Sequence, residues 1–259
     1  KELALKEKIP VYSPANIKKD YQEIIDKKPD IIITCAYGQI IPKELIEYPR
    51  LGCINIHASL LPKYRGGAPI HHAILNDEKE TGITIMYMDE GMDSGDIISK
   101  QSIKIEEADN LECLSNKLSL LGRDMIIKEL PLIINHKNNR EQQNPVLVTY
   151  APIIKREHEK IDFNKTARQI YNLVRALSPE PLAYFIVDNI DYKVVDCNIV
   201  ESKGKIGKII NVDKDSFTIM ASDKGIRITK IKPKGKNIMK VNDFFNGYNK
   251  NNFINKEVR

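Results

Sequence analysis

The order of strand-like and helix-like segments constrains the fold of this 259-residue chain more than any other feature. From about Asp30 to Leu130, short apolar runs alternate with segments whose apolar residues recur at helical spacing. The run Asp30–Ala36 is strongly apolar, which is typical of a strand buried on both faces of a sheet. We therefore predict an α/β domain with a mostly parallel sheet over residues 1–135.

A polar stretch at residues 136–144 separates this part from a second part of different character. We interpret residues 136–155 as a linker, because the stretch lacks apolar periodicity. An amphipathic helix is predicted over Asn164–Ala176. Short β-rich runs separated by turn residues then predict a small antiparallel barrel within residues 156–259. These runs are Ala183–Val187, Tyr192–Cys197, Gly207–Val212, Phe217–Ala221 and Gly225–Ile231.

One predicted strand begins at Cys53 and carries polar side chains on a single face. Strand side chains alternate between faces, so Asn55 and His57 point one way while Ile54 and Ile56 point the other way. A polar pair on an otherwise apolar strand is costly to bury unless it is hydrogen-bonded or used. The pair therefore marks a candidate site.

Asp93 lies between two glycines, shortly after the apolar run Ile83–Met88. This context is typical of a loop at the end of a strand, where α/β folds place chemical groups. An amide, an imidazole and a carboxylate suit acyl transfer. Asn55 would donate to an oxygen that gains negative charge, His57 would pass a proton, and Asp93 would orient the imidazole. No nucleophile is obviously activated, so we expect direct attack by the acceptor.

Each of these residues also has a structural interpretation. An Asn-x-His pair on a strand more often stabilises a fold than catalyses a reaction, and an aspartate in a glycine-flanked turn is usually only a turn residue. The doubled His71–His72 invites a metal site, but adjacent residues on a helix face about 100° apart and do not chelate together. Gly66–Gly67 before a helix is typical of either an anion site or a tight turn.

The whole run Asn55–Ile70 resembles the signature of the folate-dependent formyltransferases, and Glu80–Asp96 resembles its second half at the same spacing. Within that superfamily the resemblance is greatest to the methionyl-tRNA formyltransferases. It extends to Ala36–Pro42, Tyr150–Pro152 and Lys232–Lys236, and so over nearly the whole chain. The resemblance implies a Rossmann-like formyltransferase domain followed by an OB-like β-barrel that binds tRNA.

By position, the resemblance implies that Asn55, His57 and Asp93 are catalytic. It places a folate-contacting turn at Ser59, Leu60, Leu61 and Pro62. The implied reaction moves a formyl group from the co-substrate 10-formyltetrahydrofolate to the α-amine of methionyl initiator tRNA, without a metal. Arg65 is a candidate contact for the acceptor end of the tRNA. We expect a monomer that binds neither DNA nor a membrane.

The start of the chain departs from the family pattern. The family begins with a hydrophobic strand, a Gly-Thr-Pro-Asp-Phe-type turn, a helix and a basic loop, whereas this chain opens at Lys1 inside a charged helix-like segment. We interpret this as an N-terminal truncation of the formyltransferase domain. A missing central strand would leave strand edges unpaired and apolar surface uncovered.

Composition sets broader limits. A hydrophobic content of 42% allows a sizeable core, and four scattered cysteines without Cys-x-x-Cys spacing are typical of a reducing compartment. No apolar run approaches the roughly 20 residues that span a bilayer, so we expect a cytoplasmic protein. The stretch Glu201–Lys240 holds eleven Lys/Arg against four Asp/Glu, a basic band that could follow RNA phosphates.

Two other functions stay open at this point. One is a formyltransferase that acts on a sugar nucleotide or another small amine. The other is a noncatalytic RNA- or folate-binding fragment, which the shortened start suggests. The predicted second domain favours a tRNA substrate over a small amine, because an OB-like fold is suited to gripping a nucleic-acid backbone.

Overall fold

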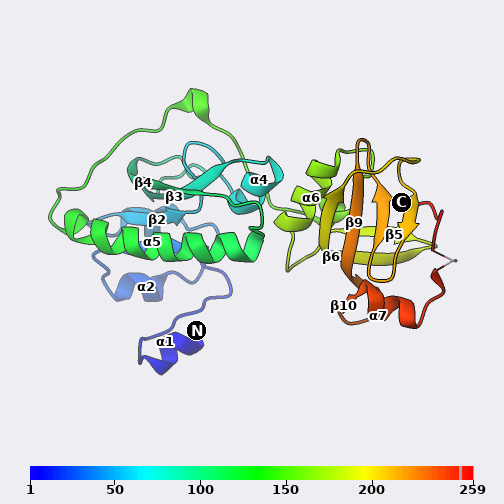
Figure 1. Ribbon diagram of the computed structural model, residues 1–259. Helices are drawn as coiled ribbons and strands as arrows, with labels where there is room; N and C mark the ends of the chain where they lie inside the picture. Colours follow the sequence, from blue (N-terminus) through cyan, green and yellow to red (C-terminus); the bar gives the residue numbers. More distant parts are fainter. Residues whose placement is uncertain (251–252, 259) are drawn as a thin grey trace.

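The computed structural model describes residues 1–250 and 253–258, which form an α/β unit and a β-rich unit lying side by side (Figure 1). The elements of the first unit are α1 (Glu2–Lys6), α2 (Gln22–Asp26), β1 (Ile32–Cys35), α3 (Lys43–Glu47), β2 (Cys53–His57), α4 (Pro69–Leu75), β3 (Glu80–Tyr87), β4 (Ile97–Lys104) and α5 (Leu111–Ile134). Those that follow are η1 (Pro145–Leu147), η2 (Arg156–Glu159), α6 (Ala167–Ala176), β5 (Tyr184–Val187), β6 (Ile190–Val200), β7 (Ile209–Val212), β8 (Phe217–Met220), β9 (Gly225–Pro233), β10 (Met239–Lys240) and α7 (Val241–Asn246). The domain boundaries drawn from the sequence stay predictions.

The first sheet has the strand order β1-β2-β3-β4. The pair β1–β2 is parallel, whereas β2–β3 and β3–β4 are antiparallel. The predicted α/β formyltransferase-type domain is confirmed, but within the described residues its sheet is mixed rather than mostly parallel. The physical reason is clearest between β3 and β4. The short loop that joins them holds no crossover helix, and without a crossover two successive strands can only pair antiparallel.

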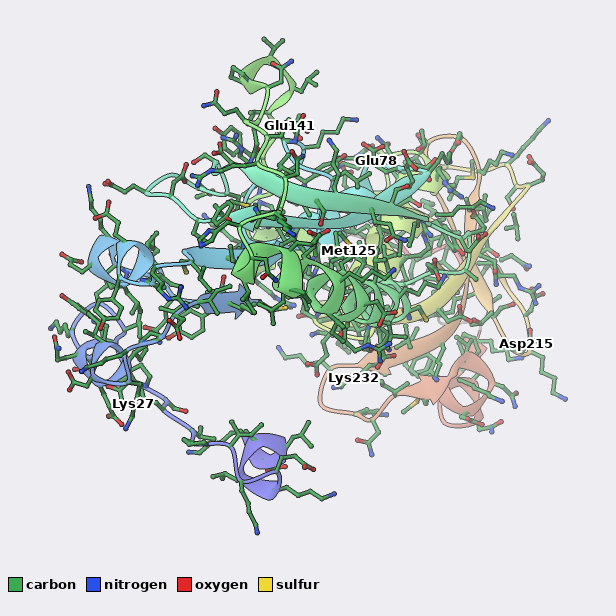
Figure 2. All side chains as sticks on the ribbon, turned by 90° about the vertical axis from the view of Figure 1, so that its left-hand side faces the viewer. Lys27, Glu78, Met125, Glu141, Asp215 and Lys232 are labelled. Carbon is green, nitrogen blue, oxygen red and sulfur yellow. The ribbon has the colours of Figure 1, made fainter. Side chains whose placement is uncertain are left out.

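Helix α5 covers one face of this sheet. Asn110 caps its start by accepting a hydrogen bond from the Cys113 N–H at 2.9 Å. Leu114, Leu118 and Met125 of the predicted helical stripe are buried against the sheet. Figure 2 shows Met125 on the side of α5 that faces the sheet. The polar side chains of β2, Asn55 and His57, are therefore left to the face of the sheet away from α5.

The second unit is an antiparallel sheet of order β5-β6-β9-β8-β7, with β10 beside β9, curled into a half-barrel. All five predicted β-rich runs are strands, so the prediction of this small antiparallel domain is confirmed. Its core is dominated by aromatic rings, with Phe217 and Phe253 packed edge to face at 5.0 Å between centroids. Helix α7, which was not predicted from the sequence, closes one end by burying Phe244 and Phe245.

Helix α6 connects the two units. A capping box starts it, in which Thr166 and Gln169 bond each other's backbone N–H groups. One side of α6 packs on the half-barrel core through Ile170 and Val174. The other side lies beside α4 (Figure 1), where Arg168 pairs with Asp77. The helix thus fixes how the two units sit together.

The chain between α5 and α6 follows a long path. In Figure 1 this green segment leaves the far end of α5, passes over β3 and β4, and descends to α6. We call residues 140–151 the connecting strap. Glu141 and Ile97 exchange two backbone hydrogen bonds of 2.7 and 2.9 Å, and Figure 2 shows Glu141 above the sheet. The predicted linker is therefore held against the first unit along much of its length.

Apolar surface is exposed near the start of the described chain. Strand β1 is an edge of the first sheet, and Ile33 on it is exposed, as are Leu3 and Leu5 of α1. Within the described ranges, none of the helices combines the length and the apolar character needed to cross a bilayer.

Candidate active site

Strand β2 places its side chains as the sequence predicts. Ile54 is fully buried in the core beneath α5, and Ile56 faces Gly122 of α5. A Cβ on Gly122 would stand 3.0 Å from the Ile56 Cγ2, so only glycine allows this approach without adjustment. Asn55 and His57 occupy the opposite face because strand side chains alternate.

Asp93 meets this pair. Its Oδ1 lies 3.4 Å from the Asn55 Nδ2, and its Oδ2 lies 3.6 Å from the His57 Nδ1. The side chain of His57 is 6% exposed and that of Asp93 is 18% exposed. The three polar groups predicted from the sequence therefore converge, and Asp93 is more exposed to solvent than His57.

The surroundings of His57 define which ring nitrogen is available. Its Nε2 lies 3.0 Å from the Tyr64 carbonyl oxygen. A carbonyl only accepts hydrogen bonds, so we assign a proton to Nε2 in both charge states of the ring. Proton exchange with a substrate is then left to Nδ1, the nitrogen that faces Asp93. A protonated ring would satisfy both neighbours at once.

The orientation of the Asn55 amide is set by Thr34 on the neighbouring strand β1. The Thr34 hydroxyl lies 2.9 Å from the Asn55 Oδ1, closer than its other acceptors, the Ile54 carbonyl and the Met88 sulfur. With its oxygen occupied, Asn55 directs its Nδ2 toward Asp93. One of the two N–H bonds on Nδ2 remains available to a substrate oxygen.

Asp93 is held in an unusual backbone conformation. Its φ of +48° lies in the left-handed region, which few non-glycine residues adopt. The Gly66 N–H donates to the Asp93 Oδ2 at 2.8 Å. The Gln143 Nε2 donates to the carbonyl oxygens of Asp93 and Gly95 at 2.8 and 2.9 Å. Contacts from two other segments thus fix both its carboxylate and its backbone.

The predicted folate-contacting turn follows β2 directly. The hydroxyl of Ser59 donates to the Lys63 carbonyl at 2.6 Å, and the Leu61 N–H donates to the Thr84 hydroxyl at 3.1 Å. The side chains of Ser59, Leu61 and Pro62 are buried, and Leu60 is half-buried. Leu60 and the turn's backbone are therefore the parts of this turn best placed to meet a ligand.

The strand residue Cys53 and the doubled His71–His72 lack surroundings that favour catalysis or metal binding. Burial raises the pKa of the Cys53 thiol to about 11, so it is neutral at physiological pH and a poor nucleophile. The His72 Nε2 contacts the Pro152 carbonyl at 3.0 Å, and burial lowers the pKa of His71. Among the described residues, no group of three or more His, Cys, Asp or Glu side chains is placed to hold a metal ion.

The residues that support this site were not predicted from the sequence. Thr34 could have been suspected, because it is a polar residue within the apolar strand run that precedes β2. Gln143 gave no such signal, since it lies in a polar stretch without periodicity. Arg65 donates to the Gln143 Oε1 at 2.8 and 3.1 Å, and its contact with tRNA stays a prediction.

Comparison with known proteins places both units in one family. The formyl transferase family matches residues 6–130, and the formyl transferase C-terminal domain matches residues 153–249. The chain is 46% identical over 251 residues to a methionyl-tRNA formyltransferase of Staphylococcus epidermidis, covering 95% of this chain and 81% of that relative.

Solved structures share the fold. A crystal structure of HypX from Aquifex aeolicus in complex with tetrahydrofolic acid aligns with a TM-score of 0.67 at 19% identity, covering 84% of this chain and 38% of that one. WlaRD, a sugar 3N-formyl transferase crystallised with dTDP and 5-N-formyl-THF, aligns with a TM-score of 0.67 at 24% identity, covering 91% of this chain and 81% of that one. At these identities the likeness shows the shared fold.

Proposed function

This chain belongs to the methionyl-tRNA formyltransferases, and on that premise we propose that it transfers the formyl group of 10-formyltetrahydrofolate to the α-amine of methionyl initiator tRNA. The observation that carries the proposal is the convergence of Asn55, His57 and Asp93, with Asp93 within 3.6 Å of each of the other two. This arrangement supports acyl transfer, because it joins a hydrogen-bond donor to a proton-exchanging pair.

The three residues divide the chemistry of the transfer. The amine nitrogen attacks the formyl carbon, and the formyl oxygen gains negative charge that the Asn55 Nδ2 stabilises. The amine loses a proton and the departing folate nitrogen gains one as its bond to the formyl carbon breaks. We propose that the His57 Nδ1 handles this exchange while the Asp93 carboxylate stabilises the imidazolium.

The folate side of the site rests on the turn Ser59–Pro62. Leu60 and the turn's backbone lie immediately after His57, close enough in the chain to seat a co-substrate beside the three polar groups. A buried hydroxyl at Ser59 and a buried Leu61 keep the turn rigid. Titration of the chain with tetrahydrofolate, compared with Leu60→Ala, tests this placement through the dissociation constant.

The half-barrel offers a surface for the tRNA backbone. Lys230 and Lys232 lie two residues apart on β9, so they share one face, and both are exposed. In the strand register, Lys240 and Asp196 lie opposite Lys230 on neighbouring strands, and Lys193 lies opposite Lys232. Like charges directly opposite one another are unfavourable unless an anion joins them. A phosphate backbone would supply it.

Incorporation of radiolabelled formyl from 10-formyltetrahydrofolate into charged initiator tRNA tests the proposal. The purified chain should label methionyl initiator tRNA, and His57→Ala should abolish most of that labelling. Uncharged tRNA is the control, because it lacks the acceptor amine. A wild-type chain that labels no tRNA, or one whose His57→Ala variant labels it equally well, contradicts the proposal.

The alternative acceptor is an aminosugar nucleotide, since WlaRD, a sugar 3N-formyl transferase, has the same fold. A competition assay with the full chain decides between the two acceptors. A higher kcat/KM for the aminosugar nucleotide than for the charged tRNA would favour the alternative. Preference for the tRNA supports the main proposal.

We also propose that the chain acts as a cytoplasmic monomer. The family's place in protein synthesis supports the location, and the monomer is supported by a site whose three polar groups all come from one chain. Sedimentation of the purified chain should give a mass near 29.6 kDa. A mass near twice that value at micromolar concentration contradicts the monomer.

A further inference from the structure

The connecting strap contacts the loop that carries Asp93 through residues around Gln143. The Arg140 Nε donates to the Asp96 Oδ2 at 2.7 Å, and Glu141 pairs with Ile97 through two backbone hydrogen bonds. Gln143 then donates from its side-chain amide to the carbonyls of Asp93 and Gly95. The strap thus holds this loop at its base and at Asp93 itself.

The same strap also holds the segment that supports the carboxylate of Asp93. The Arg65 N–H donates to the Thr149 carbonyl at 2.9 Å, and the Ala151 N–H donates to the Arg65 carbonyl at 2.7 Å. The next residue, Gly66, donates its N–H to the Asp93 Oδ2. A Cβ at Gly66 would stand 2.9 Å from the Ala151 carbonyl oxygen, so backbone and strap are in direct contact.

Gln143 joins these two anchors through one side chain. Its Oε1 accepts from the Arg65 Nε and Nη2, while its Nε2 reaches the Asp93 loop. All of its side-chain hydrogen-bonding groups are therefore engaged, and no other placement of the amide oxygen and nitrogen suits these partners. A backbone in the left-handed region needs such outside support to persist.

We propose that Gln143 is a positioning residue for the transfer, which sets the location of the Asp93 carboxylate relative to His57 and Asn55. It touches none of the reacting atoms and acts through the Asp93 backbone and, by way of Arg65, through Gly66. The kinetic consequence alone rests on the proposed function. The positions of Asp93 and Gly66 are independent of which acceptor the site uses.

Gln143→Ala and Gln143→Glu test the proposal. The first removes all four side-chain hydrogen bonds, and the second places a carboxylate oxygen against two carbonyl oxygens. The neighbouring residue Gln142 is exposed, so Gln142→Ala and Gln142→Glu are matched controls for the same chemical changes. Should Gln143→Ala fail to fold, Gln143→Glu, which keeps the side-chain volume, carries both readouts.

The first readout needs no substrate. The amide proton of Gly66 reports its hydrogen bond to the Asp93 carboxylate, and NMR of isotope-labelled chain observes it directly. We expect this signal to move upfield in the Gln143 variants and to stay in place in the Gln142 variants. An unmoved Gly66 signal in a folded Gln143 variant overturns the proposal, even if the chain formylates an unexpected acceptor.

The second readout is kinetic. A misplacement of about 1 Å at a catalytic group costs up to about 100-fold in rate, so we expect kcat to fall by about 10- to 100-fold in the Gln143 variants. The KM values for folate and tRNA should change little, because Gln143 acts on the position of Asp93 and not on binding. A Gln143 variant with kcat equal to that of its Gln142 counterpart, or with only its KM raised, overturns the proposal.

Discussion

The two sides of the candidate site are held in different ways. Asn55 and His57 lie on β2, which is hydrogen-bonded to β1 on one side and to β3 on the other. Asp93 lies on a loop with a left-handed backbone, and its support comes from Gly66 and from Gln143, which is distant along the chain. The first side is built by a sheet, and the second is built by a connection between units.

This difference separates two kinds of precision. A strand inside a sheet cannot shift by less than a register step without breaking its ladder, so the pair on β2 is fixed by secondary structure. A loop can move by fractions of an ångström when a single side chain is changed, and catalysis is sensitive to such shifts. Substitutions on the loop side should therefore alter the rate without altering the fold.

The largest effect is expected for Asp93→Asn. The substitution removes the negative charge beside the His57 Nδ1 and sets an amide near the Gly66 N–H. Loss of one proton-transfer partner costs about 10²- to 10⁴-fold, so kcat near neutral pH should fall within that range. Steady-state formylation measures it, with Asp124→Asn on the exposed side of α5 as the control. Activity within twofold of wild type would assign the proton exchange to another group.

On the loop side, Gly66→Ala should come next. The residue has a φ of +116°, and an added Cβ would meet the Ala151 carbonyl oxygen at 2.9 Å. Strain of this kind costs about 1–3 kcal/mol, and displacement of the N–H from Asp93 should lower kcat by about tenfold or more.

The matched control is Gly38→Ala, since a Cβ there meets nothing within 4 Å. Thermal unfolding and kcat are measured on both variants. If Gly66→Ala equals Gly38→Ala in both properties, the loop side is less tightly held than the strap contacts indicate.

Thr34→Val probes the side that the sheet holds. The change removes the donor to the Asn55 Oδ1 and keeps the shape of a buried side chain, so the amide is free to turn its Nδ2 away from the substrate. A lost hydrogen bond of this type is worth about 1 kcal/mol, and we expect kcat to fall by about fivefold.

Asn55→Ala should raise the barrier to transfer by more, about 3 kcal/mol, because it removes a main donor to the oxyanion. Equal losses in the two variants would mean that Thr34 acts by another route.

The sequence predicted the sheet-held side better than the loop-held side, for a physical reason. The alternation of Ile54, Asn55, Ile56 and His57 encodes which face each side chain takes, because strand geometry is local. Asp93 was found through its glycine neighbours and the family resemblance. Its supports were not found, because Gln143 lies in a stretch with no periodic pattern and acts over a long sequence separation.

A similar limit applies to the fold. The β-rich runs of the half-barrel were placed closely, since their length and turn residues are local signals. The pairing of β2 with β3 and of β3 with β4 was not, because strand direction depends on where the connecting loops run. Apolar composition alone does not distinguish a buried parallel strand from a buried antiparallel one.

The smallest effect on activity is expected for the other junction between the units, at Arg168. It bonds Asp77 and Glu107 from α6 but contacts neither side of the site, so Arg168→Met should leave kcat within about twofold of wild type if the strap alone positions Asp93.

The junction at Arg168 should instead affect stability. The hydrogen bond from Arg168 holds the pKa of Asp77 well below its ordinary value of 3.8. A lowered pKa in the folded state stabilises the chain above the ordinary value, and this stabilisation is lost as the pH falls below it. The variant should therefore unfold at a lower temperature than wild type at pH 6, by the small amount typical of a partly exposed ion pair, and the difference should shrink below about pH 4. Arg123→Met, which removes the exposed ion pair between Arg123 and Asp124 on α5, is the matched control for the loss of an arginine. A large loss of kcat in Arg168→Met would show instead that the packing of α6 is transmitted to Asp93, and the two junctions would then act as one.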